Sequence, residues 1–428
     1  MTMVREMKDS GIQWIGEIPA DWLVLPVKSF YNFETGFTPP TEKNEYYCDD
    51  GEVWITISDL TQSTVYESQT KIQKEYAKEK GTLHKEGSLL YSFKLSVGKK
   101  AILGCNAYTN EAIAVFDARN NPCIQYLYYS IDLVEFNSNE NIYGAKLLNR
   151  KLIQNAPIVF PPLSEQNIIA SFLDSKCSEI DKAIEATKAS IEEYKKLRQA
   201  IITEAVTKGL DPDVEMKDSG IEWIGEIPKH WDVTKIGKSF SLRNEKNYKS
   251  EDETKLLSLY TGRGVFPTGD EGTINSGNHA QTVVGYKVVK KDDIVVNIIL
   301  AWMGAIGISE YDGVVSPAYD VYIPNKNIAC PRFCHYLFRT TGIANECYRY
   351  GRGIMMMRWR TYSPEFKQII IPLPPIREQM KIASYLDTKC SEIDSLIKSK
   401  EKLIEELTAY RKSLIYEYVT GKKEVPAV

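Results

Sequence analysis

The stretch PPLSEQNIIASFLDSKCSEID, Pro161–Asp181, returns 213 residues later as PPIREQMKIASYLDTKCSEID, Pro374–Asp394, with 15 of 21 positions identical. In both copies the Pro-Pro pair follows an apolar run, and proline ends a strand because it has no backbone N–H to donate. Behind the prolines, apolar residues recur three and four positions apart, which is typical of a helix. The sequence therefore predicts a long helix in each copy. The first covers Glu165–Lys208 and is about 65 Å long at about 1.5 Å per residue.

The apolar positions of each predicted helix form a heptad seam. The seam consists of Ile180, Ile184, Thr187, Ile191, Tyr194, Arg198 and Ile201 in the first helix, and of Ile393, Ile397, Lys400, Ile404, Leu407, Arg411 and Leu414 in the second. A helix with one apolar stripe needs a partner that covers it, so we expect the two helices to form a coiled coil. Arg198 and Arg411 occupy equivalent seam positions. We expect their side chains to reach water or to meet acidic partners such as Glu192, Glu193, Glu405 and Glu406.

A second repeated block predicts how the two helices run. MKDSGIQWIGEIPADW, Met7–Trp22, returns as MKDSGIEWIGEIPKHW, Met216–Trp231, with 13 of 16 positions identical. Only the linker LDPDVE, Leu210–Glu215, separates the end of the first helix from the second copy of this block. The second half must therefore begin where the first helix ends, and its own helix must run back. We expect antiparallel helices, a globular domain at each end and a pseudo-twofold axis between the halves.

The segments between the repeated blocks differ from each other in sequence. Both contain short β-rich runs, such as EVWITISDL in the first and VVKKDDIVVNII in the second, separated by turns with glycine. We predict two mostly-β domains, with boundaries at 1–156 for the first domain, 157–210 for the first helical region, 211–369 for the second domain and 370–428 for the second helical region. Divergent segments on a matched scaffold fit two modules with different targets, although drift alone gives the same pattern.

Composition limits the class of protein. The 53 Lys and Arg residues against 57 Asp and Glu give a formal net charge of −4, which disfavours nucleic acid unless basic groups cluster locally. The most apolar run, Asp293–Ile308, is too short and too interrupted by glycine to cross a bilayer, and the N-terminus resembles no signal peptide. We expect a cytoplasmic protein without membrane contact. Cys330, Cys334, His335 and Cys347 fit no common zinc spacing, so we predict core packing and no metal.

The sequence also offers no candidate for catalysis. It contains neither a GxxxxGK[ST] loop nor a glycine-rich cofactor loop followed by Asn-Pro-Pro-aromatic. The set Asp213, Glu215 and Lys217 mimics a nuclease motif but lies in the linker without a supporting strand. We therefore predict no catalytic residues and a chain that is not itself an enzyme.

The order of block, variable segment, PPLSEQ helix and second complete set resembles the specificity subunit of type I restriction–modification systems, over almost the full chain. The resemblance implies an α+β fold with two mostly-β target recognition domains separated by two long antiparallel helices. It implies that each domain binds one half of a bipartite site in double-stranded DNA, and that the helices set the spacer and dock two methyltransferase (M) subunits. S-adenosylmethionine would then be bound by those partners and no cofactor by this chain. Restriction (R) subunits would be further partners.

Basic residues in the variable segments are the candidates for DNA contact. Arginine offers bidentate donors to phosphate or guanine, and nearby glycines let a backbone approach closely. The candidates are Arg349, Arg352, Arg358, Trp359 and Arg360 in YRYGRGIMMMRWR, Arg263 in YTGRGVF, Lys94, Lys99 and Lys100 in SFKLSVGKK, and Lys146, Arg150 and Lys151. Solvated loops and core packing explain the same residues without DNA. A coiled-coil adaptor without a DNA role is the alternative for the whole chain.

Overall fold

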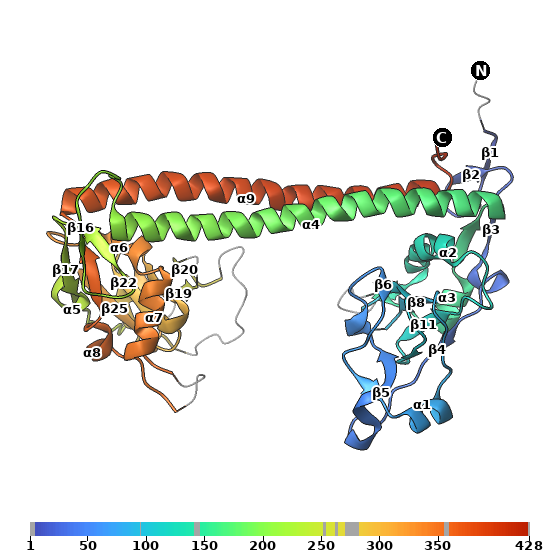
Figure 1. The fold of residues 1–428 in the computed structure, drawn as a ribbon, viewed down its shortest axis with the longest axis horizontal. Coiled ribbons are helices and arrows are strands. Elements are labelled where there is room, and N and C mark those ends of the chain that lie inside the picture. The colour runs from blue at the N-terminus through green and yellow to red at the C-terminus, as the bar shows by residue number, and fades with distance from the viewer. Residues whose placement is uncertain are drawn as a thin grey trace. The chain divides into compact units, whose positions relative to one another are not determined.

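The computed structural model describes residues 5–94, 96–140, 146–250, 254–261, 264–269, 282–354 and 359–426. The chain forms two compact units: unit 1 comprises Met1–Thr187 with Lys402–Val428, and unit 2 comprises Lys188–Glu401. Two long helices, α4 (Leu163–Lys208) and α9 (Ile376–Val419), each contribute residues to both units (Figure 1). The mixture of small sheets and long helices confirms the predicted α+β class.

Unit 1 contains a mostly-β domain carried by the helices. Its main sheet has the order β4-β11-β8-β9-β6, with bounds Glu34–Thr35, Ile113–Phe116, Leu89–Ser92, Lys100–Leu103 and Thr64–Val65. A second sheet has the order β10-β5-β7, with bounds Tyr108–Thr109, Tyr47–Ile55 and Lys71–Ile72. The pair β3-β14 joins Leu23–Pro26 to Pro157–Phe160, and the pair β12-β13 joins Asn139–Glu140 to Lys146–Leu147. The α-helices of the domain are α1 (Lys74–Lys80), α2 (Ile124–Ser130) and α3 (Arg150–Asn155).

Unit 2 is built in the same manner with different strands. Its main sheet has the order β18-β25-β22-β23, with bounds Phe240–Leu242, Tyr319–Pro324, Ile294–Asn297 and Ile306–Ile308. Three strand pairs complete it: β17-β26 (Asp232–Lys235, Ile370–Leu373), β19-β20 (Leu257–Tyr260, Gly264–Pro267) and β21-β24 (Lys287–Val289, Gly313–Val315). Its α-helices are α5 (Ile236–Ser239), α6 (Pro331–Leu337), α7 (Thr341–Tyr350) and α8 (Ser363–Phe366).

The block MKDSGIxWIGEIPxxW forms the same hairpin in each unit. Strand β1 (Met7–Asp9) pairs with β2 (Glu17–Pro19), and β15 (Met216–Asp218) pairs with β16 (Glu226–Pro228) in the same antiparallel register. Trp22 and Trp231, which follow the hairpins, are buried. Each tryptophan belongs to a core that also contains sheet and helix residues of its unit, so the block, the β domain and the helices are packed as one body within each unit.

The helices run antiparallel within each unit, as predicted. In unit 1 the ring of Phe172 lies 4.6 Å from that of Tyr418, and Asp181 pairs with Arg411 at 2.9 Å. In unit 2 Asp394 of α9 pairs with Arg198 of α4 at 3.2 Å. The aspartate of the pair therefore comes from the first repeat in unit 1 and from the second repeat in unit 2. Both arginines meet acidic partners, as expected, but these are aspartates of the other helix and not the glutamates that we named. A seam position faces the other helix, so the carboxylate within reach belongs to that helix.

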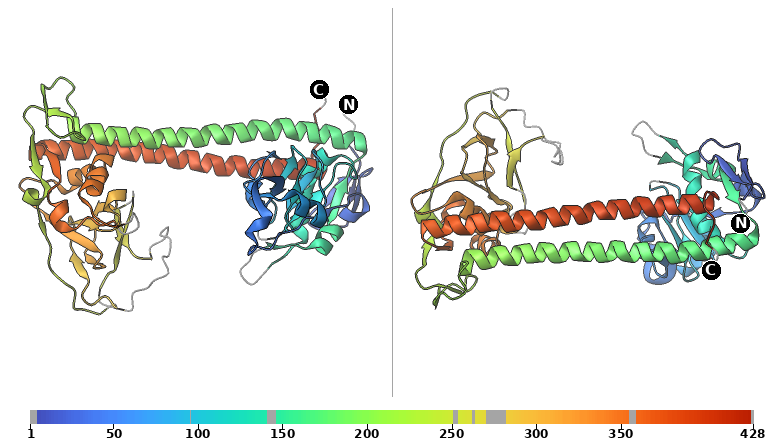
Figure 2. Two further views of the ribbon diagram at one scale, coloured as in Figure 1. Left: turned by 60° about the horizontal axis from the view of Figure 1, so that its bottom comes forward. Right: turned by 90° about the horizontal axis from the view of Figure 1, so that it is seen from above.

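The two units do not coincide with the four consecutive regions that we predicted, because each unit contains parts of both paired helices. Residues 157–210 and 370–428, which we predicted as separate helical regions, are each shared between unit 1 and unit 2. Unit 1 includes the segments from both ends of the chain, and both views in Figure 2 place the end of α9 beside the first hairpin block. The side chain of Lys422 donates to the carbonyl of Glu17, and Tyr416 Oη donates to the carbonyl of Trp14 at 2.5 Å. Among the described helices, none is long and apolar enough to cross a membrane.

Candidate nucleic-acid interface

The predicted arginines of unit 2 lie where the chain leaves α7 and folds back on itself. Arg352 and Arg360 form an antiparallel bridge in which each backbone N–H donates to the other residue's carbonyl at 2.9 Å. Trp359 stacks on Tyr348 with ring centroids 5.0 Å apart, and its Nε1 donates to the carbonyl of Tyr348 at 3.0 Å. A Cβ on Gly351 would collide with the Trp359 ring, so this close packing requires glycine. The bridge and the ring stacking thereby hold Arg352, Trp359 and Arg360 against the end of α7.

The arginine side chains around this turn are exposed. Arg349 pairs with Glu346 at 2.9 Å and lies over the Tyr350 ring, and Arg352 pairs with Glu365 at 3.2 Å. Their side chains are 65% and 68% exposed. The guanidinium groups therefore face solvent, whereas their carboxylate partners Glu346 and Glu365 are only 10% and 23% exposed. We call Tyr348, Arg349, Arg352, Trp359 and Arg360 the arginine–aromatic cluster.

Two predicted residues cannot be placed. Arg263 and Arg358 lie outside the described residues. Arg360 is described, and its guanidinium donates to the carbonyl of Trp359 at 2.8 Å. Among the described residues the cluster therefore brings together Arg349, Arg352, Trp359 and Arg360.

In unit 1 some of the predicted lysines share one surface. Lys94 and Lys99 are exposed at the turn between β8 and β9. Lys146 pairs with Glu135 at 2.7 Å, and a Cβ on Gly98 would collide with the same carboxylate. The turn at Gly98 and Lys146 therefore both lie next to Glu135.

Lys100 faces the interior instead. Its side chain is only 9% exposed, and its Nζ donates to Asp132 at 2.7 Å and to the carbonyl of Tyr128 at 2.6 Å. The same Nζ lies 4.6 Å from the centroid of the Tyr128 ring, and burial raises the pKa of Tyr128 to about 12. The charge of Lys100 is compensated within unit 1.

The last two candidates of unit 1 lie at the start of α3. Asn149 caps this helix by accepting from the N–H of Leu152 at 2.9 Å. Arg150 donates to the carbonyl of Phe33 at 3.0 Å and covers the Phe33 ring, whereas Lys151 is exposed. Arg150 thus joins α3 to the β4 side of the domain, and Lys151 carries the freer charge of the two.

The sequence did not identify the residues that join each domain to its helix. Gln379 is fully buried and makes three hydrogen bonds: it accepts from the N–H of Cys330 at 2.8 Å and donates to the carbonyls of Ile328 and Pro374 at 2.8 and 2.7 Å. Its equivalent, Gln166, donates to the carbonyl of Pro161 at 2.8 Å. The identical Glu-Gln pair in both repeats was the available signal.

A crevice of unit 2 holds the histidine that we considered as a zinc ligand. The crevice has a volume of about 650 Å³, and its lining includes Arg332, His335, Tyr336 and Asp387. His335 Nε2 accepts from Arg339 at 2.8 Å. Burial, together with the charge of Arg339, lowers the pKa of His335 to about 3, so the ring is neutral near pH 7. Cys334 and Cys347 are buried in the core, and the described residues contain no group of metal-ligand side chains.

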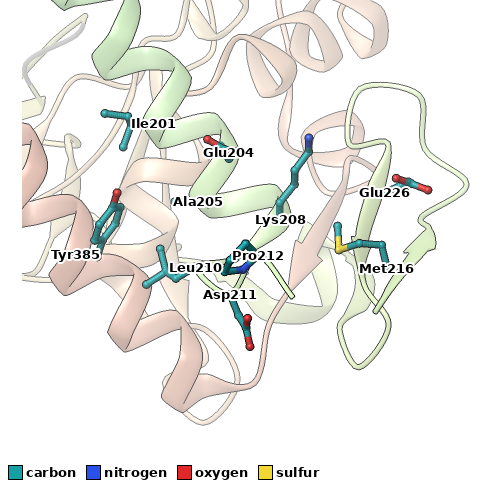
Figure 3. A pocket seen from close by; sticks show the side chains of 11 residues that line it. Ile201, Glu204, Ala205, Lys208, Leu210, Asp211, Pro212, Met216, Glu226 and Tyr385 are labelled. Carbon is teal, nitrogen blue, oxygen red and sulfur yellow. The ribbon is translucent and has the colours of Figure 1, made fainter. Parts of the chain in front are cut away.

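A second hollow of unit 2 lies at the end of α4. It has a volume of about 460 Å³, and Figure 3 shows Glu204 and Lys208 of α4, Asp211 of the linker, Met216 of the hairpin block and Tyr385 of α9 around it. The hollow thus marks the place where a helix end, the linker, the hairpin block and the second helix meet.

These features define a duplicated α+β protein in which two mostly-β domains, one with an exposed arginine–aromatic cluster, are carried on paired long helices. The chain belongs to the family described as the type I restriction modification DNA specificity domain, whose model matches residues 19–193 and 228–409. The resemblance predicted from the sequence motifs is therefore confirmed.

Relatives in this family are similar over nearly their whole length. The putative type I restriction enzyme MjaX specificity subunit of Methanocaldococcus jannaschii is 26% identical, and the match covers 96% of each chain. The type I restriction enzyme EcoBI specificity subunit of Escherichia coli is 24% identical over 98% of this chain and 90% of its own. A solved chain from work on complex assembly and conformational transition of the type I R-M system has a TM-score of 0.67 at 14% identity, covering 95% of this chain and 99% of that one. It supports the fold.

Proposed function

We propose that this chain is the DNA-recognition subunit of a type I restriction–modification complex, in which each mostly-β domain binds one half of a bipartite site. The observation that carries the proposal is the match of the specificity-domain model to both halves of the chain, 19–193 and 228–409. One family domain per half provides two modules. Their different strand orders provide two surfaces, so the two half-sites differ in sequence.

The chemistry of the arginine–aromatic cluster supports DNA as the ligand of unit 2. Arginine presents a planar fork that matches the guanine edge and phosphate, and the cluster holds Arg349 and Arg352 outward against packed tyrosine rings. In unit 1 the corresponding contacts come from Lys94, Lys99, Lys146 and Lys151, with Arg150 beside them. Lys100 is left out because its charge is paired with Asp132. Local clusters of this kind allow DNA binding despite a net charge of −4.

The remaining functions of the complex are assigned to its partners. Two methyltransferase subunits dock on the paired helices and bind S-adenosylmethionine, and restriction subunits join the same complex in the cytoplasm. This chain then contributes recognition and spacing and no catalytic step. The names of the relatives, which are specificity subunits of type I restriction enzymes, support this division of labour.

Mapping of methylated adenines in cells that express this chain with its methyltransferase subunits tests the proposal. We expect one bipartite motif with a fixed gap, and a continuous motif would contradict two-domain recognition. Arg352→Gln should weaken recognition of one half-site only. Arg332→Gln is the matched control, because Arg332 is also exposed and paired, with Asp387 at 2.8 Å, but lies outside the cluster. Equal effects of the two variants would remove the cluster from the interface.

The adaptor alternative is separated by a gel-shift assay. A coiled-coil adaptor assembles with its partners but retards no duplex. We expect the complex of this chain with methyltransferase subunits to bind a duplex that carries the mapped motif. Affinity should fall steeply with salt, because phosphate contacts release counterions.

A further inference from the structure

The hairpin block of unit 1 touches the start of one long helix and the end of the other. At the start of α4, Trp22 Nε1 donates to Glu165 at 3.0 Å, and Arg5 pairs with Glu165 at 2.9 Å. At the end of α9, Gly421 has a positive φ of +71° and lies so close to the block that a Cβ would collide with Pro19 and meet the Trp22 ring at 2.9 Å. Trp22 is therefore in contact with both helix ends.

Unit 2 repeats the arrangement with the helices exchanged. Gly209, which ends α4 with a φ of +80°, places its missing Cβ 3.2 Å from Trp231 and 3.3 Å from Glu378 at the start of α9. His230 Nε2 of the block lies 2.8 Å from the carboxylate of Glu378. The hollow in Figure 3 lies beside this junction, with Lys208, Leu210 and Met216 around it.

We infer that the hairpin block is a clamp that fixes the start of each long helix against the end of the other, and that Trp22, Glu165 and Gly421 in unit 1, with Glu378 and Gly209 in unit 2, are positioning residues for the gap between half-sites. This inference rests on the proposed function. Gly209 lies 44 positions after Glu165, and Gly421 lies 43 positions after Glu378. Nearly equal helix lengths between clamped ends are what two such clamps require.

The other contacts between the helices specify their register less strictly. A heptad seam repeats every seven residues, so a slip of about 10 Å, equal to about three base pairs, restores its apolar contacts. The Asp181–Arg411 and Asp394–Arg198 pairs have half-exposed carboxylates, which can follow a shifted arginine. A glycine packed under a tryptophan tolerates no such shift, because the close approach exists at one position only.

The two clamps differ in a way that provides a matched control. Trp22 Nε1 is bonded to Glu165, whereas Trp231 Nε1 is buried without a partner among the described residues. Trp22→Phe therefore removes a hydrogen bond and Trp231→Phe removes none, with the same loss of ring size. Likewise, Gly421→Ala forces a collision with Pro19, whereas Gly209→Ala meets its nearest neighbour at 3.2 Å.

The test measures methylation by the purified complex of this chain with its methyltransferase subunits. The substrates are duplexes that carry the two mapped half-sites with the native gap or a gap about three base pairs shorter or longer, the step that a slip of one heptad would give. For Trp22→Phe we expect the methylation rate on altered-gap duplexes, divided by the rate on the native-gap duplex, to rise about tenfold. A factor of about ten corresponds to the loss of one hydrogen bond to a charged group. Gly421→Ala should raise this ratio at least as much, and Trp231→Phe should leave it near the wild-type value.

A merely structural role gives a different result. If Trp22→Phe lowers methylation of all three duplexes by the same factor, the clamp does not set the gap. If Trp231→Phe changes the ratio equally, the hydrogen bond between Trp22 and Glu165 is not what sets it. If Gly421→Ala fails to fold, as judged by circular dichroism, Trp22→Phe carries the test. Failure of the proposed function is distinguishable, because the wild-type complex would then show no preference for any gap.

Discussion

Replacing Gln379 with leucine should open the junction between α6 and α9 in unit 2. The substitution removes three hydrogen bonds and leaves the part-buried N–H of Cys330 and carbonyl of Ile328, and the buried carbonyl of Pro374, without their side-chain partner. Each unpaired buried group costs about 1–3 kcal/mol, and the added apolar burial returns about 1–2 kcal/mol. We expect a net loss of about 3 kcal/mol in the free energy of local opening.

Hydrogen–deuterium exchange measures this loss where it occurs. Amides of α6 should exchange about two orders of magnitude faster in Gln379→Leu, since about 1.4 kcal/mol corresponds to a factor of ten. Gln166→Leu is the control. Gln166 makes one described side-chain bond, to Pro161, so α2 of unit 1 should exchange at most about tenfold faster. Equal acceleration in both variants, or unchanged exchange in α6, would refute the assignment of Gln379 as the joint.

Further expectations concern charge. Between about pH 6.5 and pH 3 the unfolded chain binds a proton at His335 that the folded chain does not, so unit 2 should lose up to about 1.4 kcal/mol of stability per pH unit as the pH falls. In urea titrations, His335→Gln should flatten this dependence of stability on pH, and an unchanged dependence would exclude the histidine as its cause. Asp181→Asn leaves the three-quarters buried Arg411 without its partner and should lower the free energy of unfolding by about 1–2 kcal/mol. Adding Arg411→Met should restore most of this stability, and a double-mutant cycle that shows no coupling would contradict the ion pair. Lys100→Met should lower the melting temperature of unit 1, whereas Lys99→Gln should weaken DNA binding without changing stability, and the reverse pattern would exchange their roles.

The long helices could be predicted because their pattern is local and repeated. The seam period gave a first helix from Glu165, and the observed α4 begins at Leu163. The antiparallel direction followed from the short linker. The sheets were predicted only as short strands, because their order joins segments far apart in the sequence, such as β4 with β11.

Side-chain partners were harder to predict than elements. Arg411 pairs with Asp181 because the two repeated helices run antiparallel. The pairing depends on the register between the two helices, which the sequence of one repeat does not specify. Lys99 and Lys100 looked equivalent in SVGKK. Lys100 begins β9 and its side chain enters the interior, whereas Lys99 belongs to the preceding turn and stays exposed. The arginines near α7 became candidates because aromatic residues and glycines surround them in the sequence.

Unit 1 is built from segments at both ends of the chain, and this has a consequence for synthesis. The ribosome finishes all of unit 2 before it makes Lys402–Pro426, the segment that supplies Leu414, Ile415 and Tyr418 to the core of unit 1. Until then Ile180 and Ile184 of the nascent polypeptide lack their cover, and chaperones or proteases can act on them. Translation that stops early would therefore yield a product with a finished second domain and an unfinished first one, which cellular quality control can remove before it joins a complex.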